Sequence, residues 1–195
     1  MPITFDATGL QQIGPMAWAN PGSDDKIEVK VVEGQAFEPS WMHDLGALRR
    51  GFAGMYGEAG CLVELERYDV AGVPVIYQVV KVPHPALPAG QVFMAIYTVP
   101  KTPVYAQLIY AAAESGMTGL REATLMAQLG MPTDWAMPHP FDPQLRSRLP
   151  FHRGDDPAFD RQFPDHPLSR ARAWAGHIGR TMRIDPAFAA QANLG

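Results

Sequence analysis

The sequence predicts an α+β fold, in which an antiparallel sheet of about five strands carries helices packed on it, much like an α/β/α sandwich. Two observations support this prediction. The 18 glycines and 19 prolines make up 37 of the 195 residues, which is high for a helical bundle but ordinary for a sheet protein rich in turns. Five short stretches also have the apolar or alternating patterns of strands, whereas only three segments repeat their apolar residues at helical spacing.

The first strand and the first helix follow a polar, turn-rich lead-in. Residues 26–33 alternate, with Ile27, Val29 and Val31 on one face, which predicts a half-buried strand. From residue 41 to residue 56 the apolar side chains recur every three or four residues. This spacing predicts an amphipathic helix that begins after Ser40 as its N-cap and ends near Gly57.

Four further strands are expected in succession. Residues 61–68 alternate as an edge strand does, whereas residues 73–82 and 91–99 are nearly all apolar, as in central strands. Residues 104–113 are ambiguous, because their alanines would also suit a helix. The prolines in the short turn at 100–103 favour a hairpin strand.

Beyond the strands we expect a second helix, an extension and a last helix. Residues 120–130 have helical spacing, with Thr118 as the expected cap and Gly130 at the end. Eight prolines and several aromatic residues then lie between 131 and 167. Because disordered segments lack aromatic residues, we expect residues 131–195 to pack on the α+β domain of residues 1–130 as one globular unit.

The order of these elements resembles the PsbP-like α/β/α sandwich family of small accessory proteins. The stretches VPVIYQVVKV, QVFMAIYTV and VYAQLIYAAA in succession, with LREATLMAQLG after them, carry the resemblance. It concerns topology, covers about half of the chain and includes no diagnostic motif. It implies a binding or assembly role without catalysis.

Composition excludes several classes of protein. The net charge is −4, and even the more basic residues 141–195 hold 6 acidic against 8 basic residues, so nucleic acid is not expected as a partner. No run approaches the roughly 20 apolar residues of a membrane span, and the N-terminus does not read as a signal peptide. We therefore expect a cytoplasmic protein without a membrane partner. The excess of arginine over lysine points to a bacterial source, and Cys61 is expected to be a buried, inert thiol.

The segment DHPLS, which holds Asp165, His166 and Ser169, contains the three residue types of a hydrolase triad. Proline is favoured at the first position of a helix, so Pro167 and its neighbour His166 indicate a helix start instead. The side chains of adjacent residues such as Asp165 and His166 also tend to point in different directions, whereas a triad needs them to converge on one point. A second interpretation is a binding role, in which Asp165, His166 and Arg170 contact a partner or fix the extension to the core.

No cofactor and no metal are expected, because the histidines form no ligand motif and no glycine-rich phosphate loop occurs. Trp135, Phe141 and Asp142 lie among prolines, and such aromatic side chains either pack within the chain or anchor a partner. We expect a non-enzymatic binding or accessory protein, of assembly or chaperone type, whose partner is another protein or a second copy of itself. The alternative is a small hydrolase or other enzyme, whose site lies where the C-terminal extension meets the sheet, with His166 as base and Asp165 or Asp142 orienting it.

Overall fold

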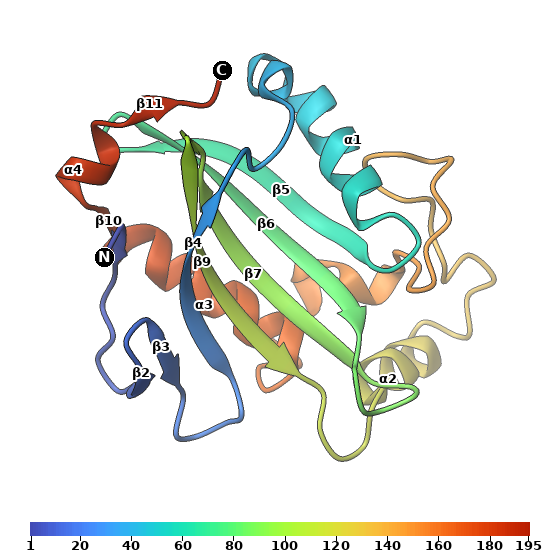
Figure 1. Ribbon diagram of the computed structural model, residues 1–195. Helices are drawn as coiled ribbons and strands as arrows, with labels where there is room; N and C mark the ends of the chain where they lie inside the picture. Colours follow the sequence, from blue (N-terminus) through green and yellow to red (C-terminus); the bar gives the residue numbers. More distant parts are fainter.

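The computed structural model describes all 195 residues, and its centre is a seven-stranded antiparallel sheet (Figure 1). The strand order is β2-β3-β4-β9-β7-β6-β5. The strands are β2 (Gln11–Gly14), β3 (Ala17–Ala19), β4 (Lys26–Glu33), β5 (Cys61–Val70), β6 (Val73–Pro83), β7 (Gln91–Val99) and β9 (Val104–Ala113). The five long strands are those expected, and the ambiguous segment is strand β9. The two additional strands, β2 and β3, come from the turn-rich lead-in, in which no strand was expected.

Helices lie on both faces of this sheet, and the α+β class is therefore confirmed. The helices are α1 (Leu45–Tyr56), α2 (Leu120–Gln128), α3 (Pro167–Thr181) and the short α4 (Pro186–Ala189). Helix α3 runs behind the sheet in Figure 1 and packs on β7 and β9, whereas α1 lies at the β5 end. None of the four helices combines the length and apolarity needed to cross a membrane.

The apolar core has two parts because successive side chains of a strand point to opposite faces. On one face, Val79 of β6 and Phe93 of β7 pack with Leu168 and Ile178 of α3. On the other face, Val80 packs with α1 residues in a smaller cluster. Alternation between the two faces therefore explains both clusters. The burial that it predicts is wrong at one position near the end of β4, where Val31 is 47% exposed.

The starts of two helices differ from expectation. Helix α1 begins at Leu45, because the Asp44 carboxylate accepts a hydrogen bond from the Gly46 N–H (2.7 Å) and caps it; Ser40 belongs instead to a 3₁₀ turn at Pro39–His43. Helix α2 follows Gly119, which has a φ of +72°, so Thr118 is not its cap. The left-handed region suits glycine, and no side chain caps this helix.

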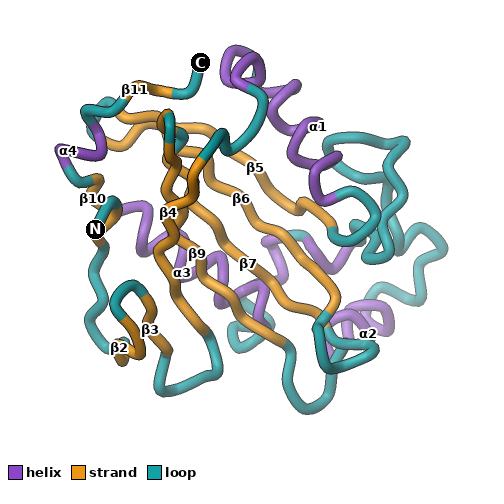
Figure 2. The backbone as a smooth tube through the Cα atoms, in the orientation of Figure 1, coloured by secondary structure: helices purple, strands orange, loops and turns teal.

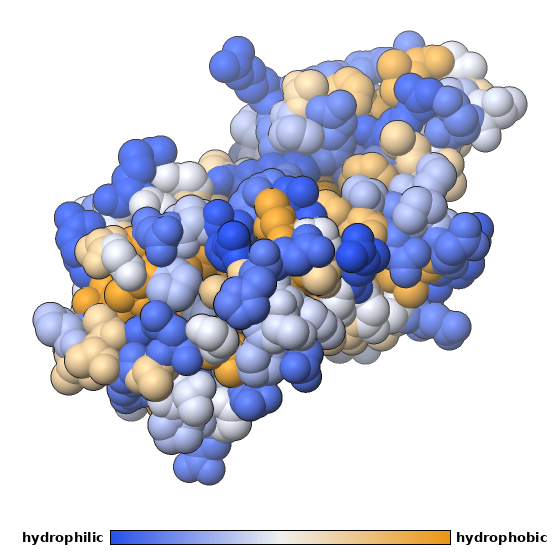
Figure 3. Space-filling model, turned by 90° about the horizontal axis from the view of Figure 1, so that it is seen from above, coloured by the Kyte–Doolittle hydropathy of each residue, from blue (hydrophilic) through white to orange (hydrophobic).

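Both chain ends are held by short strand pairs. Strand β1 (Ile3–Thr4) pairs with β10 (Arg183–Ile184), and β11 (Ala192–Asn193) pairs with β8 (Lys101–Thr102). Figure 2 shows the N-terminus beside β10 and most of the segment between α2 and α3 as loop. The face seen in Figure 3 is mostly hydrophilic, with apolar residues in separate patches.

Candidate functional site

The DHPLS segment begins a helix, as expected. His166 is the N-cap of α3, its Nδ1 accepts a hydrogen bond from the Leu168 N–H (3.2 Å), and Pro167 is the first helical residue. The Ser169 hydroxyl donates to Asp160 and accepts from Arg121, and the Asp165 carboxylate makes no hydrogen bond. The three residue types therefore do not converge as a triad, which requires the histidine to contact both of its partners.

His166 instead joins a group of ionisable side chains buried between β6, β9, α2, α3 and the extension. We refer to this group as the buried polar cluster. Its members come from five separate parts of the chain, and each lies close to at least one other member or acts on its charge. They are Lys81, Glu114, Arg121, Glu122, His152, Asp155 and His166.

A buried ion pair fixes the extension to the sheet at one side of the cluster. The Lys81 ammonium on β6 donates to the Asp155 carboxylate at 2.7 Å, and each side chain is only 1% exposed. The same Asp155 oxygen accepts the backbone N–H of His152 (2.9 Å). Because buried charges are tolerated only when paired and hydrogen-bonded, these two contacts account for the presence of Lys81 in an apolar strand.

Arg121 joins the extension to helix α3. Its guanidinium donates to the carbonyls of Gly154 (2.9 Å) and Asp156 (3.2 Å) and to the Ser169 hydroxyl (2.7 Å). It also forms an ion pair with Asp160 at 3.0 Å. The planar guanidinium carries several fixed donors, so one buried side chain can hold several acceptors in place.

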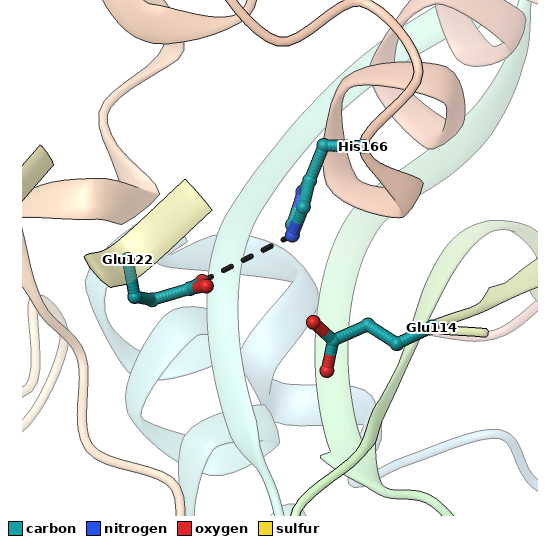
Figure 4. A group of neighbouring side chains, drawn as sticks. All are labelled: Glu114, Glu122 and His166. Carbon is teal, nitrogen blue, oxygen red and sulfur yellow. Dashed lines mark ion pairs between the residues drawn. The ribbon is translucent and has the colours of Figure 1, made fainter. Parts of the chain in front are cut away.

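The remaining members, two histidines and two glutamates, have fewer partners. Glu122 lies 3.9 Å from His152 Nε2 and 4.0 Å from His166 Nε2, and Figure 4 shows His166 and Glu122 directed toward each other with Glu114 beside them. Four buried atoms here have no hydrogen-bond partner. They are Glu122 Oε2, His152 Nδ1, Asp155 Oδ1 and His166 Nε2.

Burial shifts the titration of His152, His166 and Glu122 toward their neutral forms. It lowers the pKa of His166 to about 3, with Arg121 adding to the shift, and that of His152 to about 4. Burial also raises the pKa of Glu122. Both imidazoles are therefore neutral at pH 7, and His166 is a weak base, which does not suit general-base catalysis at that pH.

The six residues expected to bind a partner lie in different surroundings. Trp135 stacks on His152, with ring centroids 5.2 Å apart, at the edge of the buried polar cluster. Phe141 lies under the Arg49 guanidinium of α1, and its neighbour Asp142 accepts the Gln144 N–H. These two residues belong to the α1 side of the molecule.

The other three residues lie at the start of α3. Asp165 is exposed, and its carbonyl accepts from Arg170, whose guanidinium pairs with the buried carboxylate of Asp25 at 2.7 Å. Arg170 therefore contacts the core of its own chain. A role of any of the six toward a partner stays a prediction.

Sequence reasoning missed most of the cluster. Lys81 is the one charged residue in the apolar stretch 73–82, and such an isolated charge signals a buried partner. Arg121 and Glu122 lie in the helix expected at residues 120–130, but neither was singled out as a site residue. No local signal marks His152 or Asp155, because their partners lie far away in the sequence.

The fold and this cluster define an α+β domain whose sheet is covered by helices and joined to a C-terminal extension through buried charges. No family model matches the chain, and no curated protein matches it either. Among solved structures it is similar to the Ran-binding protein Mog1p of Saccharomyces cerevisiae, at 11% identity and a TM-score of 0.45, over 97% of this chain and 94% of that one. A protein of unknown function from Pseudomonas aeruginosa, PA94, is 10% identical with a TM-score of 0.31, over 66% and 78%. These values are too low to bear on function.

Proposed function

We propose that this chain is a non-enzymatic binding protein, of assembly or chaperone type, that holds a protein segment on the uncovered part of its sheet. The observation that carries the proposal is the unequal cover of the two faces. Helix α3 covers one face at β7 and β9, whereas α1 covers the other face only at β5 and β6.

The uncovered part of the second face has an apolar floor and a charged edge. Ile109 and Ala111 of β9 are half-buried on this face, with no helix over them. Their register partners on β4, Glu28 and Lys26, are exposed. Apolar positions bordered by charges of both signs suit a polypeptide, which offers apolar side chains and polar backbone together.

A pocket extends this surface at one end. Its volume is about 540 Å³, and it lies between Lys26, Val92, Ala111 and the turn at His84–Leu87. A side chain of a bound segment would fit this pocket, since anchor residues of protein partners fill such hollows.

The rival hydrolase has less support. Asp165 does not contact the His166 ring, and Asp142 lies on the α1 side of the molecule. The ring nitrogen that such a carboxylate would orient, Nδ1, accepts the Leu168 N–H instead.

Composition supports a bacterial source and a cytoplasmic location. Membership of the PsbP-like family is also part of this proposal. A second copy of the chain is one form that the protein partner can take.

The test places a photo-cross-linkable residue at Ile109 and, as a matched control, at the exposed Ala158 outside this face. We expect irradiation in cells of the source organism to link position 109, but not position 158, to one protein or to a second copy. The purified partner should then bind Ile109→Arg at least about tenfold more weakly than the wild type. Equal cross-linking from both positions, or unchanged binding by the variant, would contradict the proposal.

A further inference from the structure

We propose that Glu114, Glu122, His152 and His166 form a binding site for one divalent transition-metal cation, with Zn²⁺ as the representative ion. Glu114 follows β9, Glu122 lies in the first turn of α2, and His166 caps α3. One ligand atom from each of these three residues lies within 4.8 Å of the other two (Figure 4). Imidazole and carboxylate together suit zinc and its neighbours among the divalent metals.

The first argument comes from buried side-chain atoms that have no hydrogen-bond partner. The His166 side chain is 9% exposed, and its Nε2 atom is buried, has no hydrogen-bond partner and is directed at Glu122. Glu122 Oε2 is also buried without a partner. The nearest Glu122 atom to His166 Nε2 is Oε1, at 4.0 Å, which is too far for a hydrogen bond. Buried polar atoms almost always have partners, so an unpaired imidazole nitrogen and an unpaired carboxylate oxygen in one cluster indicate an absent bound group.

The second argument is charge, which selects a cation. Lys81 is neutralised by Asp155, and Arg121 pairs with Asp160. By contrast, no lysine or arginine lies within ion-pair distance of Glu114 or Glu122. Two carboxylates without a basic partner would repel an anion and attract a cation.

The third argument is the orientation of the ligands. The two oxygens of Glu114 accept from the N–H groups of Gly119 (2.8 Å) and Gln91 (2.9 Å), which fixes the carboxylate and leaves it further lone pairs. His152 presents Nε2 toward Glu122 and has Nδ1 3.5 Å from the Asp155 carboxylate. A carboxylate beside the second nitrogen is the usual support of a metal-binding histidine.

A pocket reaches two of the four ligands. Its volume is about 310 Å³, and Glu114 and His166 line it together with Arg121 and Arg170, whose charges are paired with Asp160 and Asp25. Since ligand atoms on one zinc ion lie about 3.3 Å apart, the side chains would move closer together by about 1 Å when the ion binds.

Metal binding at His166 would change its tautomer. Without metal, Nδ1 accepts from Leu168, so the ring proton is on Nε2. A metal bond to Nε2 moves that proton to Nδ1, which then can no longer accept from Leu168. Metal binding and capping of α3 by His166 therefore exclude each other, and the Leu168 amide reports which state is present.

Absence of a local histidine motif is consistent with this site, because its ligands come from four separate parts of the chain. Glu114 also lines the pocket at the end of the proposed partner surface. The tests nevertheless separate the two proposals, because Glu122→Gln changes only the metal site and Ile109→Arg changes only the sheet surface.

The test is titration of the full chain with Zn²⁺ by calorimetry, followed by NMR of the Leu168 amide. We expect one equivalent to bind to the wild type, at least about tenfold weaker binding to Glu122→Gln, and a shift of the Leu168 resonance that the variant lacks. The control is His177→Asn, which removes a surface histidine 3.6 Å from Asp6 and should leave binding unchanged.

Circular dichroism without metal checks that Glu122→Gln folds, and Glu114→Gln supplies a second variant should it not. Three outcomes would overturn the site: no saturable binding below about 100 μM, equal losses in Glu122→Gln and His177→Asn, or binding that leaves the Leu168 amide unmoved.

Discussion

The Lys81 ammonium lies 2.7 Å from the Asp155 carboxylate, and the pair links the central sheet to the extension across 74 residues of sequence. Both side chains are 1% exposed, so neither charge has water as an alternative partner. We expect Lys81→Met to destabilise the fold by about 3–5 kcal/mol, because it leaves the Asp155 carboxylate buried and unpaired.

The double variant Lys81→Met/Asp155→Leu tests this explanation. Since it removes both charges, it should recover much of the stability that the single variant loses, although the His152 N–H also loses its acceptor. Urea unfolding of the three proteins measures the differences. Equal midpoints for the single and double variants would show that the loss comes from packing and not from the unpaired charge.

Arg121→Met should cost about 3 kcal/mol, because Gly154, Asp156 and Ser169 all lose a buried hydrogen-bond partner at once. Arg161→Met is the matched control: this arginine is exposed and makes no hydrogen bond or ion pair, so its change should stay within about 0.5 kcal/mol. Hydrogen exchange should locate the added opening in Arg121→Met at residues 152–160. An equal increase in hydrogen exchange over the whole sheet would argue against this local role of Arg121.

His166 contributes to stability as a cap, and His166→Asn should separate this role from simple loss of volume. Asparagine can also accept the Leu168 N–H, whereas His166→Ala has no acceptor and should be about 1 kcal/mol less stable than His166→Asn. For a chain of this length, that difference is about 2–4 °C in Tm. The melts are done with a chelator present. Identical melting of the two variants would mean that the cap contributes nothing.

Stability should fall in acid partly through Asp25. Burial alone would raise the pKa of Asp25, but hydrogen bonds from Arg170 and Tyr110 outweigh burial and hold it below the ordinary 3.8. A group with a lowered folded pKa contributes its stability above the unfolded value, and this contribution is lost as the pH falls through the folded value. Asp25→Asn should therefore be less stable than the wild type at pH 7, with the difference shrinking below pH 3.8. A constant difference between pH 7 and pH 2 would exclude this carboxylate as a source of acid sensitivity.

The last prediction concerns the extension as part of the core. A chain cut after residue 130 loses α3, including the buried Leu168, Ala171 and Ile178, and should not unfold cooperatively. Ala171→Arg tests the same interface in the full chain, because position 171 faces the sheet, and Ala173→Arg on the exposed side of α3 is its control. Thermal melts that are alike for the two arginine variants would show that α3 does not depend on this contact.

The long strands and helix α3 could be predicted from sequence because their signals are local. Alternation at Ile27 and Val29 gave the strand and its buried face, and Pro167 after His166 gave the start of a helix. The starts of α1 and α2 were wrong for a physical reason. Asp44 and Ser40 are both good caps, and only the packing of the chain decides between them.

The buried polar cluster could not be predicted in the same way. His152 and Glu122, or Lys81 and Asp155, meet only when the extension folds back over the sheet edge, and no spacing in the sequence records that encounter. Of the cluster, His166 alone was singled out: its place at the start of a helix is confirmed, its role toward a partner stays a prediction, and the geometry gives no support to the alternative role as a catalytic base. The isolated charge of Lys81 in its apolar strand was the one usable clue.

The pairing of Ile3 with Ile184 sets a condition on synthesis of this protein. Strand β1 is synthesised before β10, and its residue Ile3 precedes the partner Ile184 by 181 positions (184 − 3). Contacts of such long sequence separation form late and slow folding. Strand β1 therefore has no pairing partner until β10 has been synthesised. A translation product that ends before β10 would leave the backbone N–H and C=O groups of β1 free to pair with another molecule.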